Sequence, residues 1–332
     1  MHNHSNVTNA AANVSPAGTR QAGECPDTAA SVRYMQGRCR LPRWLKRPIV
    51  RAGRKAVVER ELGAHRLHTV CAEARCPNRA ECFARGTATF LIMGSRCTRD
   101  CGFCAVTHGT PGALDPDEPE RISRTVRALG LSYVVITSVT RDDLADGGAG
   151  HFAAVVRRIK ESTPAVRVEI LVPDFGGSRE ALSTVLDSGP DVLNHNVETV
   201  PRLYPRIRPQ ADYHRSLELL QHAARFEPPL IVKSGLMAGV GERDDEVVQV
   251  LGDLHKSGCG VVTIGQYLQP SPRQAVVERF VDPQQFEQWE ALGREMGFKA
   301  VWAGPFVRSS YMAADVFAAC GESFAAALDR SA

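Results

Sequence analysis

The sequence predicts an α/β protein whose central element is a parallel sheet covered by helices. Apolar, β-branched runs recur six times, and segments with helical periodicity separate them. Such an alternation is typical of parallel strands, which are usually connected through helices. The six runs cover residues 87–93, 133–139, 166–172, 191–197, 230–237 and 260–268, and a run at 300–307 is either a seventh strand or an extension.

The helices are predicted from apolar side chains that return at every third or fourth position. One stripe consists of Phe152, Val155, Val156 and Ile159, and another of Val247, Val250, Leu251 and Leu254. A further helix is expected over residues 54–70, and ordered structure is expected to begin at residues 41–48.

Polar side chains gather where the predicted strands end. They are Thr137, Ser138, Arg141, Asp174, Asn194, His195, Glu198, Lys233, Ser234, Gln266 and Tyr267. Barrels and open doubly wound sheets both bind ligands at the carboxyl ends of their strands, so this pattern does not distinguish the two. No GxGxxG motif follows the first strand, which weakens a dinucleotide-binding interpretation.

The composition is that of a soluble protein without a nucleic-acid partner. The 332 residues are 43% hydrophobic and 23% charged, with a net charge of +3, and no basic run carries interleaved aromatic residues. No apolar stretch approaches the length of a membrane helix, about 18 residues. The opening MHNHSNVTNA lacks the order of a secretory signal, so a cytoplasmic protein with reduced thiols is expected. Residues 1–40 are expected to form a disordered polar tail.

Ten cysteines in such a chain indicate metal or redox chemistry rather than disulfides. The stretch CTRDCGFC places Cys97, Cys101 and Cys104 at the spacing C-x3-C-x2-C. Three thiolates on one loop can hold three corners of a four-iron cluster and leave the fourth iron open. A structural zinc ion needs four ligands, and only His108 is near enough in sequence to complete the set. The spacing therefore favours an iron–sulfur cluster, with zinc as the alternative.

A second triplet, Cys71, Cys76 and Cys82, lies in CAEARCPNRAEC with the less specific spacing C-x4-C-x5-C. Taken alone, it could be a set of buried structural thiols or a zinc site completed by Cys97 or a histidine. The two triplets could also form one zinc site with spare ligands, whereas two clusters would use every thiol.

The motifs together resemble the lipoyl synthase family of the radical S-adenosylmethionine (SAM) superfamily. The matching stretches are CAEARCPNRAEC, GTATFLIMGSRCTRDCGFCAV, VVITSVTRDDLADGGAGHF, LVPDF, DVLNHNVETV, KSGLMAGVGE, TIGQYLQP and GPFVRSSY, within residues 41–315. The resemblance implies a partial (β/α)6 TIM-like barrel of the radical SAM type with N- and C-terminal extensions. The expected parts are a tail (1–40), an extension with the auxiliary-cluster cysteines (41–86), the barrel (87–298) and a C-terminal extension with RSSY (299–332).

The resemblance implies a radical SAM sulfurtransferase with two 4Fe–4S clusters. Cys97, Cys101 and Cys104 would hold the cluster that binds and cleaves SAM. Cys71, Cys76 and Cys82 would hold an auxiliary cluster that donates sulfur, with Ser310 as the fourth ligand and Ser309 as the second choice. A serine oxygen is a harder ligand than a thiolate and would leave one iron easier to release.

The implied reaction inserts two sulfur atoms, at carbons 6 and 8 of an octanoyl chain linked to a lysine of a carrier domain, and uses two SAM. The implied partners are octanoylated lipoyl carrier domains, namely the E2 subunits of 2-oxoacid dehydrogenases and the H protein of glycine cleavage, together with an electron donor. No membrane partner is expected, and a monomer is expected because no coiled coil or other dimerisation segment is visible.

The expected contacts to SAM are Asp142, Asp143, Asn194, Glu198 and Arg208. Some of these residues could instead have a structural role. Asp142 and Asp143 could cap a helix, and Arg208 could form a surface ion pair. Gly147 and Gly148 could be turn glycines. His195 is expected to be a hydrogen-bonded residue at a strand end rather than a catalyst.

The chain departs from the family pattern at two positions, with Gln274 in place of a histidine and Phe83 in place of a tryptophan. Four cysteines match no ligand motif, namely Cys25, Cys39, Cys259 and Cys320, and Cys259 is expected to be buried.

Two other functions are compatible with parts of the sequence. A radical methylthiotransferase acting on transfer RNA would normally carry an RNA-binding domain, and a zinc-stabilised binding module would not account for the repeated strand-helix array.

Overall fold

The structure is a computed structural model that describes residues 41–46, 55–85 and 87–328, the last eight by their backbone only. The predicted tail, residues 1–40, lies outside the described residues, as do Cys25 and Cys39. Among the described residues, no helix has the length and apolar character needed to cross a membrane.

The centre of the fold is an eight-stranded sheet in the order β1-β2-β5-β6-β7-β8-β9-β10. Every neighbouring pair is parallel except β1 with β2. The strands are β1 (His68–Thr69), β2 (Thr89–Ile92), β5 (Tyr133–Ser138), β6 (Arg167–Leu171), β7 (Val192–Asn194), β8 (Ile231–Ala238), β9 (Val261–Gln266) and β10 (Ala300–Gly304). All six predicted strands are confirmed, and the run at 300–307 contributes a seventh parallel strand, β10.

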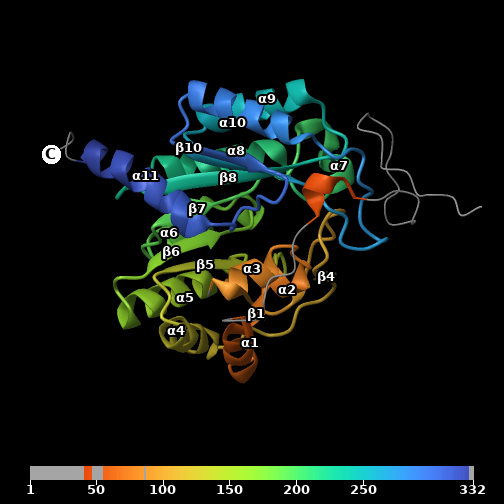
Figure 1. The fold of residues 1–332 in the computed structure, drawn as a ribbon. Coiled ribbons are helices and arrows are strands. Elements are labelled where there is room, and N and C mark those ends of the chain that lie inside the picture. Colours follow the sequence, from red (N-terminus) through yellow and green to blue (C-terminus); the bar gives the residue numbers. More distant parts are fainter. Residues whose placement is uncertain (1–40, 47–54, 86, 329–332) are drawn as a thin grey trace, which may run out of the picture.

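Helices cover the outside of the sheet, with α1, α4 and α5 on one side of Figure 1 and α8, α9 and α10 on the other. They are α1 (Lys55–Ala64), α2 (Val70–Glu73), α3 (Arg79–Ala84), α4 (Glu118–Ala128), α5 (Ala149–Ser162), α6 (Arg179–Leu186), α7 (Tyr204–Ile207), α8 (Tyr213–Ala224), α9 (Asp244–Lys256), α10 (Pro283–Glu295) and α11 (Ala313–Leu328). The short 3-10 helices are Arg43–Leu45, Phe175–Gly177 and Pro201–Leu203. The predicted stripes on α5 and α9 are buried, because they cover the strands.

The predicted helix over residues 54–70 is wrong in its second half. Helix α1 ends at Ala64, Arg66 adopts a left-handed conformation (φ 50°), and the chain then extends as β1. In β1, Thr69 is opposite Phe90 of β2 in an antiparallel pair. This strand pairing outweighs the helical preference of the segment and holds the second cysteine triplet against the first barrel strand.

Helix α11 fills the amino-terminal end of the barrel interior. Its residues Val316 and Cys320 pack on Val192, Ile231 and Val261, which lie near the starts of their strands. In Figure 1 this helix extends to the left, whereas α7 and β4 (Thr107–His108) are on the right. The opposite end of the barrel, at the carboxyl ends of the strands, therefore remains for the loop that carries the first cysteine triplet.

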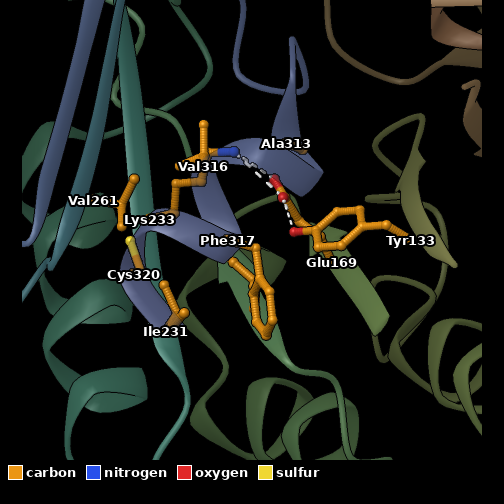
Figure 2. Close-up of a pocket in the computed structure, with 10 residues that line it drawn as sticks. Tyr133, Glu169, Ile231, Lys233, Val261, Ala313, Val316, Phe317 and Cys320 are labelled. Atoms are coloured by element: carbon orange, nitrogen blue, oxygen red, sulfur yellow. Dashed lines mark hydrogen bonds and ion pairs between the residues drawn. The ribbon is translucent and has the colours of Figure 1, made fainter. Parts of the chain in front are cut away.

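A buried charge pair lies beneath α11, as Figure 2 shows. Nζ of Lys233 on β8 donates to Oε1 of Glu169 on β6 (3.0 Å), and the hydroxyl of Tyr133 on β5 donates to Oε2 of Glu169 (2.6 Å). The side chains of Lys233 and Glu169 are only 2% and 1% exposed. An ion pair this deep is stable only when both partners are present.

Candidate metal centre

The loop that carries the first cysteine triplet follows β2 and is closed by a two-stranded ladder. Strand β3 (Arg96–Cys97) pairs in parallel with β4 (Thr107–His108). The backbone N–H of Gly109 donates to the carbonyl of Cys97 (3.0 Å). This ladder was not predicted, since two-residue strands carry no periodic signal. It brings the start of the triplet loop back beside its end.

The triplet loop is anchored to the ends of the barrel strands by backbone hydrogen bonds. The N–H of Thr98 donates to the carbonyl of Thr140, just after β5 (3.1 Å), and the N–H of Gly102 donates to the carbonyl of Ile207 in α7 (2.9 Å). A Cβ atom on Gly102 would lie 3.0 Å from the carbonyl oxygen of Arg206. Glycine at this position between two cysteines therefore permits the loop to approach α7 closely.

The thiols of this loop are partly enclosed, and the protein already directs donors at one of them. The Sγ atom of Cys97 accepts the backbone N–H of Arg99 (3.4 Å) and that of Thr140 (3.3 Å). Burial raises the pKa of Cys101 to about 11 and that of Cys104 to about 12. The free thiols of Cys101 and Cys104 are therefore protonated at neutral pH, and metal binding has to displace their protons.

A buried arginine that the sequence did not reveal stiffens this loop. Arg99, between Cys97 and Cys101, donates through Nε and Nη2 to the carboxylate of Asp142 (both 2.8 Å), and through Nη2 to Oδ1 of Asp174 (2.6 Å). Burial by itself would raise the pKa of Asp174, but the hydrogen bond and charge of Arg99 outweigh it and lower that pKa to about 2. This double ion pair fastens the loop to the ends of β5 and β6.

Two residues that are predicted to contact SAM are already hydrogen-bonded to arginines of the protein. Asp142 accepts from Arg99, and Asp143 accepts from Nε and Nη2 of Arg141 (both 2.8 Å). The alternative that these aspartates cap a helix is wrong, because the N-cap residue of α5 is Gly148, in a left-handed conformation (φ 87°). The positive φ of Gly148 favours glycine, and a Cβ atom there would lie 2.4 Å from Sδ of Met93, which would have to move.

Arg208 and Glu198 lie near the first triplet. The guanidinium of Arg208 is buried and donates through Nη1 to the carbonyls of Asn196 and Val197 (2.9 and 3.1 Å). Its charge favours the thiolate of Cys101. The alternative of a surface ion pair for Arg208 is therefore wrong. Its Nε is buried and has no partner among the described residues, which leaves a donor for a ligand.

Glu198 follows β7 in a left-handed conformation (φ 64°) that a non-glycine residue seldom adopts. Desolvation by the surrounding protein raises its pKa, against the opposing charge of Arg208. Its Oε1 accepts from Nδ2 of Asn196 (3.1 Å). A strained backbone of this kind is typical of functional sites.

Asn194, the last residue of β7, and His195, which follows it, are both buried. Asn194 donates through Nδ2 to Oε1 of Glu169 (3.1 Å), whereas its Oδ1 is buried without a partner in the described part of the chain. His195 is hydrogen-bonded to the carbonyl of Val172 (2.9 Å) and to the hydroxyl of Ser216 (3.0 Å). Burial lowers its pKa to about 4. The prediction that His195 is a hydrogen-bonded residue rather than a catalyst agrees with these contacts.

The second triplet is carried by two short helices beside β2. Cys71 is in α2, which is capped by the hydroxyl of Thr69, and Cys82 is in α3. Between them the backbone N–H of Cys76 donates to the carbonyl of Cys71 (3.2 Å). Burial raises the pKa of Cys71 to about 11. The three thiols are thus fixed by a compact helix-turn-helix rather than by a loose loop.

The segment with RSSY is tied to this second triplet at both of its ends. Nδ2 of Asn78 donates to the carbonyl of Phe306 (2.7 Å), and the hydroxyl of Tyr311 donates to Oε1 of Glu81 in α3 (3.1 Å). Ser309 and Ser310 lie between these two contacts, although more than two hundred residues separate them from the cysteines in sequence.

The two serines differ in their surroundings. The hydroxyl of Ser309 accepts a hydrogen bond from Nδ2 of Asn196 (3.1 Å), at the end of the barrel near Glu198. Ser310 is half-buried, next in the chain to Tyr311 and its contact with α3. This arrangement favours Ser310 over Ser309 as a ligand on the side of the second triplet.

The donor sets fit iron–sulfur clusters. Within the described ranges, no three histidine, cysteine or acidic side chains lie close enough together to hold a single metal ion. In a cluster, however, each thiolate binds a different iron. The thiols on each segment are buried or partly enclosed, and backbone N–H groups donate to the sulfur of Cys97. Such ligands and donors are the environment that iron–sulfur clusters use. Ser310 is next in the chain to Tyr311, which contacts α3 of the second triplet. The unmatched Cys259 and Cys320 are both buried in the core, as expected for Cys259.

Comparison with known proteins gives consistent matches. The family model described as "Radical SAM superfamily" matches residues 91–254. A lipoyl synthase of Caldanaerobacter subterraneus subsp. tengcongensis is 53% identical over 274 residues, which cover 82% of this chain and 96% of that protein. A lipoyl synthase of Alkaliphilus metalliredigens is 49% identical over 276 residues, or 83% of this chain and 95% of that protein.

Among solved structures, a crystal structure of methylornithine synthase is similar with a TM-score of 0.50 and 17% sequence identity, covering 73% of this chain and 70% of the other. At this identity the likeness concerns the fold alone. It agrees with the expected partial TIM-like barrel of the radical SAM type.

Proposed function

The chain belongs to the lipoyl synthase family of the radical SAM superfamily, and from this premise we propose how its residues divide the work of the reaction. The activity is radical insertion of two sulfur atoms at carbons 6 and 8 of a protein-bound octanoyl-lysine, which forms the lipoyl cofactor. The cofactors are two 4Fe–4S clusters and SAM. The family thereby sets aside both a transfer-RNA methylthiotransferase and a zinc-stabilised binding module.

The first triplet is proposed to bind the cluster that cleaves SAM. When bound, this cluster supplies an electron that converts SAM into methionine and a radical able to remove hydrogen from an unactivated CH2 group. The residues Cys97, Cys101 and Cys104 would hold it, while Arg99 keeps their loop against the strand ends. Support comes from the partly enclosed loop and its N–H donors to sulfur.

SAM is proposed to lie beside the first triplet, at the carboxyl ends of β5 to β8. Glu198 and Arg208 are retained as its contacts. Glu198 has a strained backbone, and the buried Nε of Arg208 has no partner among the described residues. Asn194 contributes a buried Oδ1 that likewise has no partner in the described part of the chain. Asp142 and Asp143 are instead proposed to act indirectly, because each is already bound by an arginine.

The second triplet is proposed to hold the cluster that supplies sulfur, with Cys71, Cys76, Cys82 and Ser310 as ligands. The paired contacts of residues 306–311 with α3 support this set. The proposed roles therefore follow the expected parts of the chain. Residues 41–86 carry the auxiliary site, 87–298 form the barrel, and 299–332 carry the serine ligand and the helix α11 that fills the amino-terminal end of the barrel.

The substrate is a lipoyl domain that carries an octanoyl group, and a reductant supplies electrons to the radical SAM cluster. We further propose that the carriers are E2 subunits of 2-oxoacid dehydrogenases and the H protein of glycine cleavage. The protein is proposed to work as a cytoplasmic monomer without a nucleic-acid or membrane partner.

The observation that carries the assignment of residues is that the RSSY segment, far away in sequence, contacts the segment of the second triplet through Asn78 and Glu81. An octanoyl-lysine peptide, SAM and dithionite would be incubated with the reconstituted protein under anaerobic conditions. We expect one lipoyl product for every two 5′-deoxyadenosine molecules. Formation of 5′-deoxyadenosine without any sulfur-containing product would contradict the assignment of the second site.

A further inference from the structure

Residues 267–275, here called the bridging segment, run from the end of β9 across both cysteine-bearing segments. On one side, the backbone N–H of Ala275 donates to the carbonyl of Gly102 in the first triplet loop (2.7 Å). On the other side, Nη1 of Arg75, which lies within the second triplet, donates to the carbonyl of Pro270 (3.4 Å). A single short segment thus contacts both candidate cluster sites.

Gln274 is the residue of the bridging segment whose side chain reaches the first triplet. Its Nε2 donates to the carbonyl of Cys104 (3.1 Å), and its Oε1 accepts from the hydroxyl of Ser271 (2.5 Å). Its own carbonyl accepts from Nε2 of Gln269 (2.8 Å). Since a carbonyl only accepts, Cys104 fixes which end of the amide faces it, and Ser271 holds the other end. Gln274 is therefore an oriented donor to the last cysteine of the triplet.

The rest of the bridging segment restricts how far Gln274 can move. Tyr267 is buried, and its hydroxyl donates to the carbonyl of Ala275 (2.7 Å). The N–H of Gln274 donates back to the carbonyl of Ser271 (3.1 Å). A displacement of the first triplet loop relative to the second triplet would have to break these contacts or move the whole segment.

The reaction makes the distance between the two candidate cluster sites important. A substrate carbon must lose hydrogen at one site and then reach sulfur at the other, and such steps lose rate steeply when reacting groups are misplaced by about 1 Å.

We propose that Gln274 is a positioning residue that holds the Cys104 end of the first triplet loop in register with the second triplet. The substrate carbon activated at one site is thereby presented to the sulfur of the other. This role rests on the proposed function, because it concerns the coupling between the two sites rather than either site alone.

The test compares Gln274→Met, which keeps the length but removes the amide, with Gln274→His, which can again donate an N–H to the Cys104 carbonyl. Gln288→Met makes the same exchange on the exposed face of α10 and serves as the matched control. Each reconstituted protein is assayed for 5′-deoxyadenosine without substrate, and for lipoyl product per 5′-deoxyadenosine with octanoyl-lysine peptide. Hydrogen exchange is followed in the peptide that contains the Ala275 amide.

For Gln274→Met we expect unchanged 5′-deoxyadenosine formation without substrate, and about fivefold less lipoyl product per 5′-deoxyadenosine, the factor set by one neutral hydrogen bond. The Ala275 amide should exchange about fivefold faster. Gln274→His should restore both values, and Gln288→Met should match the parent.

The proposal is overturned if Gln274→Met retains the parental product ratio, if it loses cleavage and insertion in equal proportion, or if histidine fails to restore the ratio. A parent protein that forms 5′-deoxyadenosine but no lipoyl product would instead refute the proposed function. In that case the exchange rates of the Ala275 amide in the Met and His variants would still decide whether Gln274 positions the loop.

Discussion

Replacing Asp174 with asparagine should remove an anchor of the first triplet loop and make the protein's stability less dependent on pH. In the folded protein Asp174 is fully buried, and Arg99 holds its pKa at about 2 against an ordinary value of 3.8. A difference of nearly two pKa units corresponds to about 2 kcal/mol of folding free energy at neutral pH.

The direction of the pH effect follows from the lowered pKa. The Asp174 carboxylate stabilises the fold fully above its unfolded pKa, near 4, and this contribution is lost as the pH falls through the folded value of about 2. The stability difference between the parent and Asp174→Asn should therefore be about 2 kcal/mol at pH 7 and about half of that at pH 3.

The assay is urea unfolding of the reduced apoprotein, followed by circular dichroism at pH 7, 5, 4 and 3. Asp187→Asn, which alters an exposed aspartate after α6, is the control and should stay within about 0.5 kcal/mol of the parent. A stability difference that is absent at pH 7, or that grows as the pH falls, would refute the assignment of Asp174 as a buried partner of Arg99.

Three further predictions concern the two sites and the barrel interior. Cys101→Ala should abolish both SAM cleavage and sulfur insertion, whereas Cys71→Ala should abolish insertion alone. Assays of 5′-deoxyadenosine and of lipoyl product measure the two activities. SAM cleavage by Cys101→Ala would contradict the assignment of Cys101 as a ligand of the first cluster. Ser310→Ala should reduce insertion more than cleavage in the same assays, and unchanged turnover would remove this serine from the mechanism. Lys233→Met should destabilise the protein by about 3–5 kcal/mol, because it leaves Glu169 buried without its partner. In urea unfolding, the double variant with Glu169→Leu should recover most of that loss. A Lys233→Met variant as stable as the parent would show that the pair is not buried.

The sequence was a good guide where a feature is periodic or clustered along the chain. The strands β2 and β5 to β9 are runs of buried β-branched residues, and each cysteine triplet lies within a dozen residues. The repeated strand-helix pattern predicted parallel strands, as observed, but it did not give the order of the strands in the sheet.

The features that the sequence did not reveal depend on long-range contacts. Arg99 reads as one more exposed arginine until the fold brings Asp174 to it from 75 positions away. The sequence also does not show where a side chain at a strand end points. Asn194 is predicted to contact SAM, whereas the structure shows its Nδ2 donating to Glu169. The predicted helix over residues 54–70 was too long, because part of this segment forms β1, whose partner strand is available only in the folded chain.

The two cysteine triplets are tested most directly by the content of iron, sulfide and zinc in protein purified without oxygen, compared with the variant in which Cys71, Cys76 and Cys82 are all alanine. If each triplet holds its own cluster, we expect about eight irons with matching sulfide per parent chain and about four in the variant, without bound zinc. Zinc without sulfide in the parent, or an unchanged iron content in the variant, would show that the triplets do not each hold a cluster.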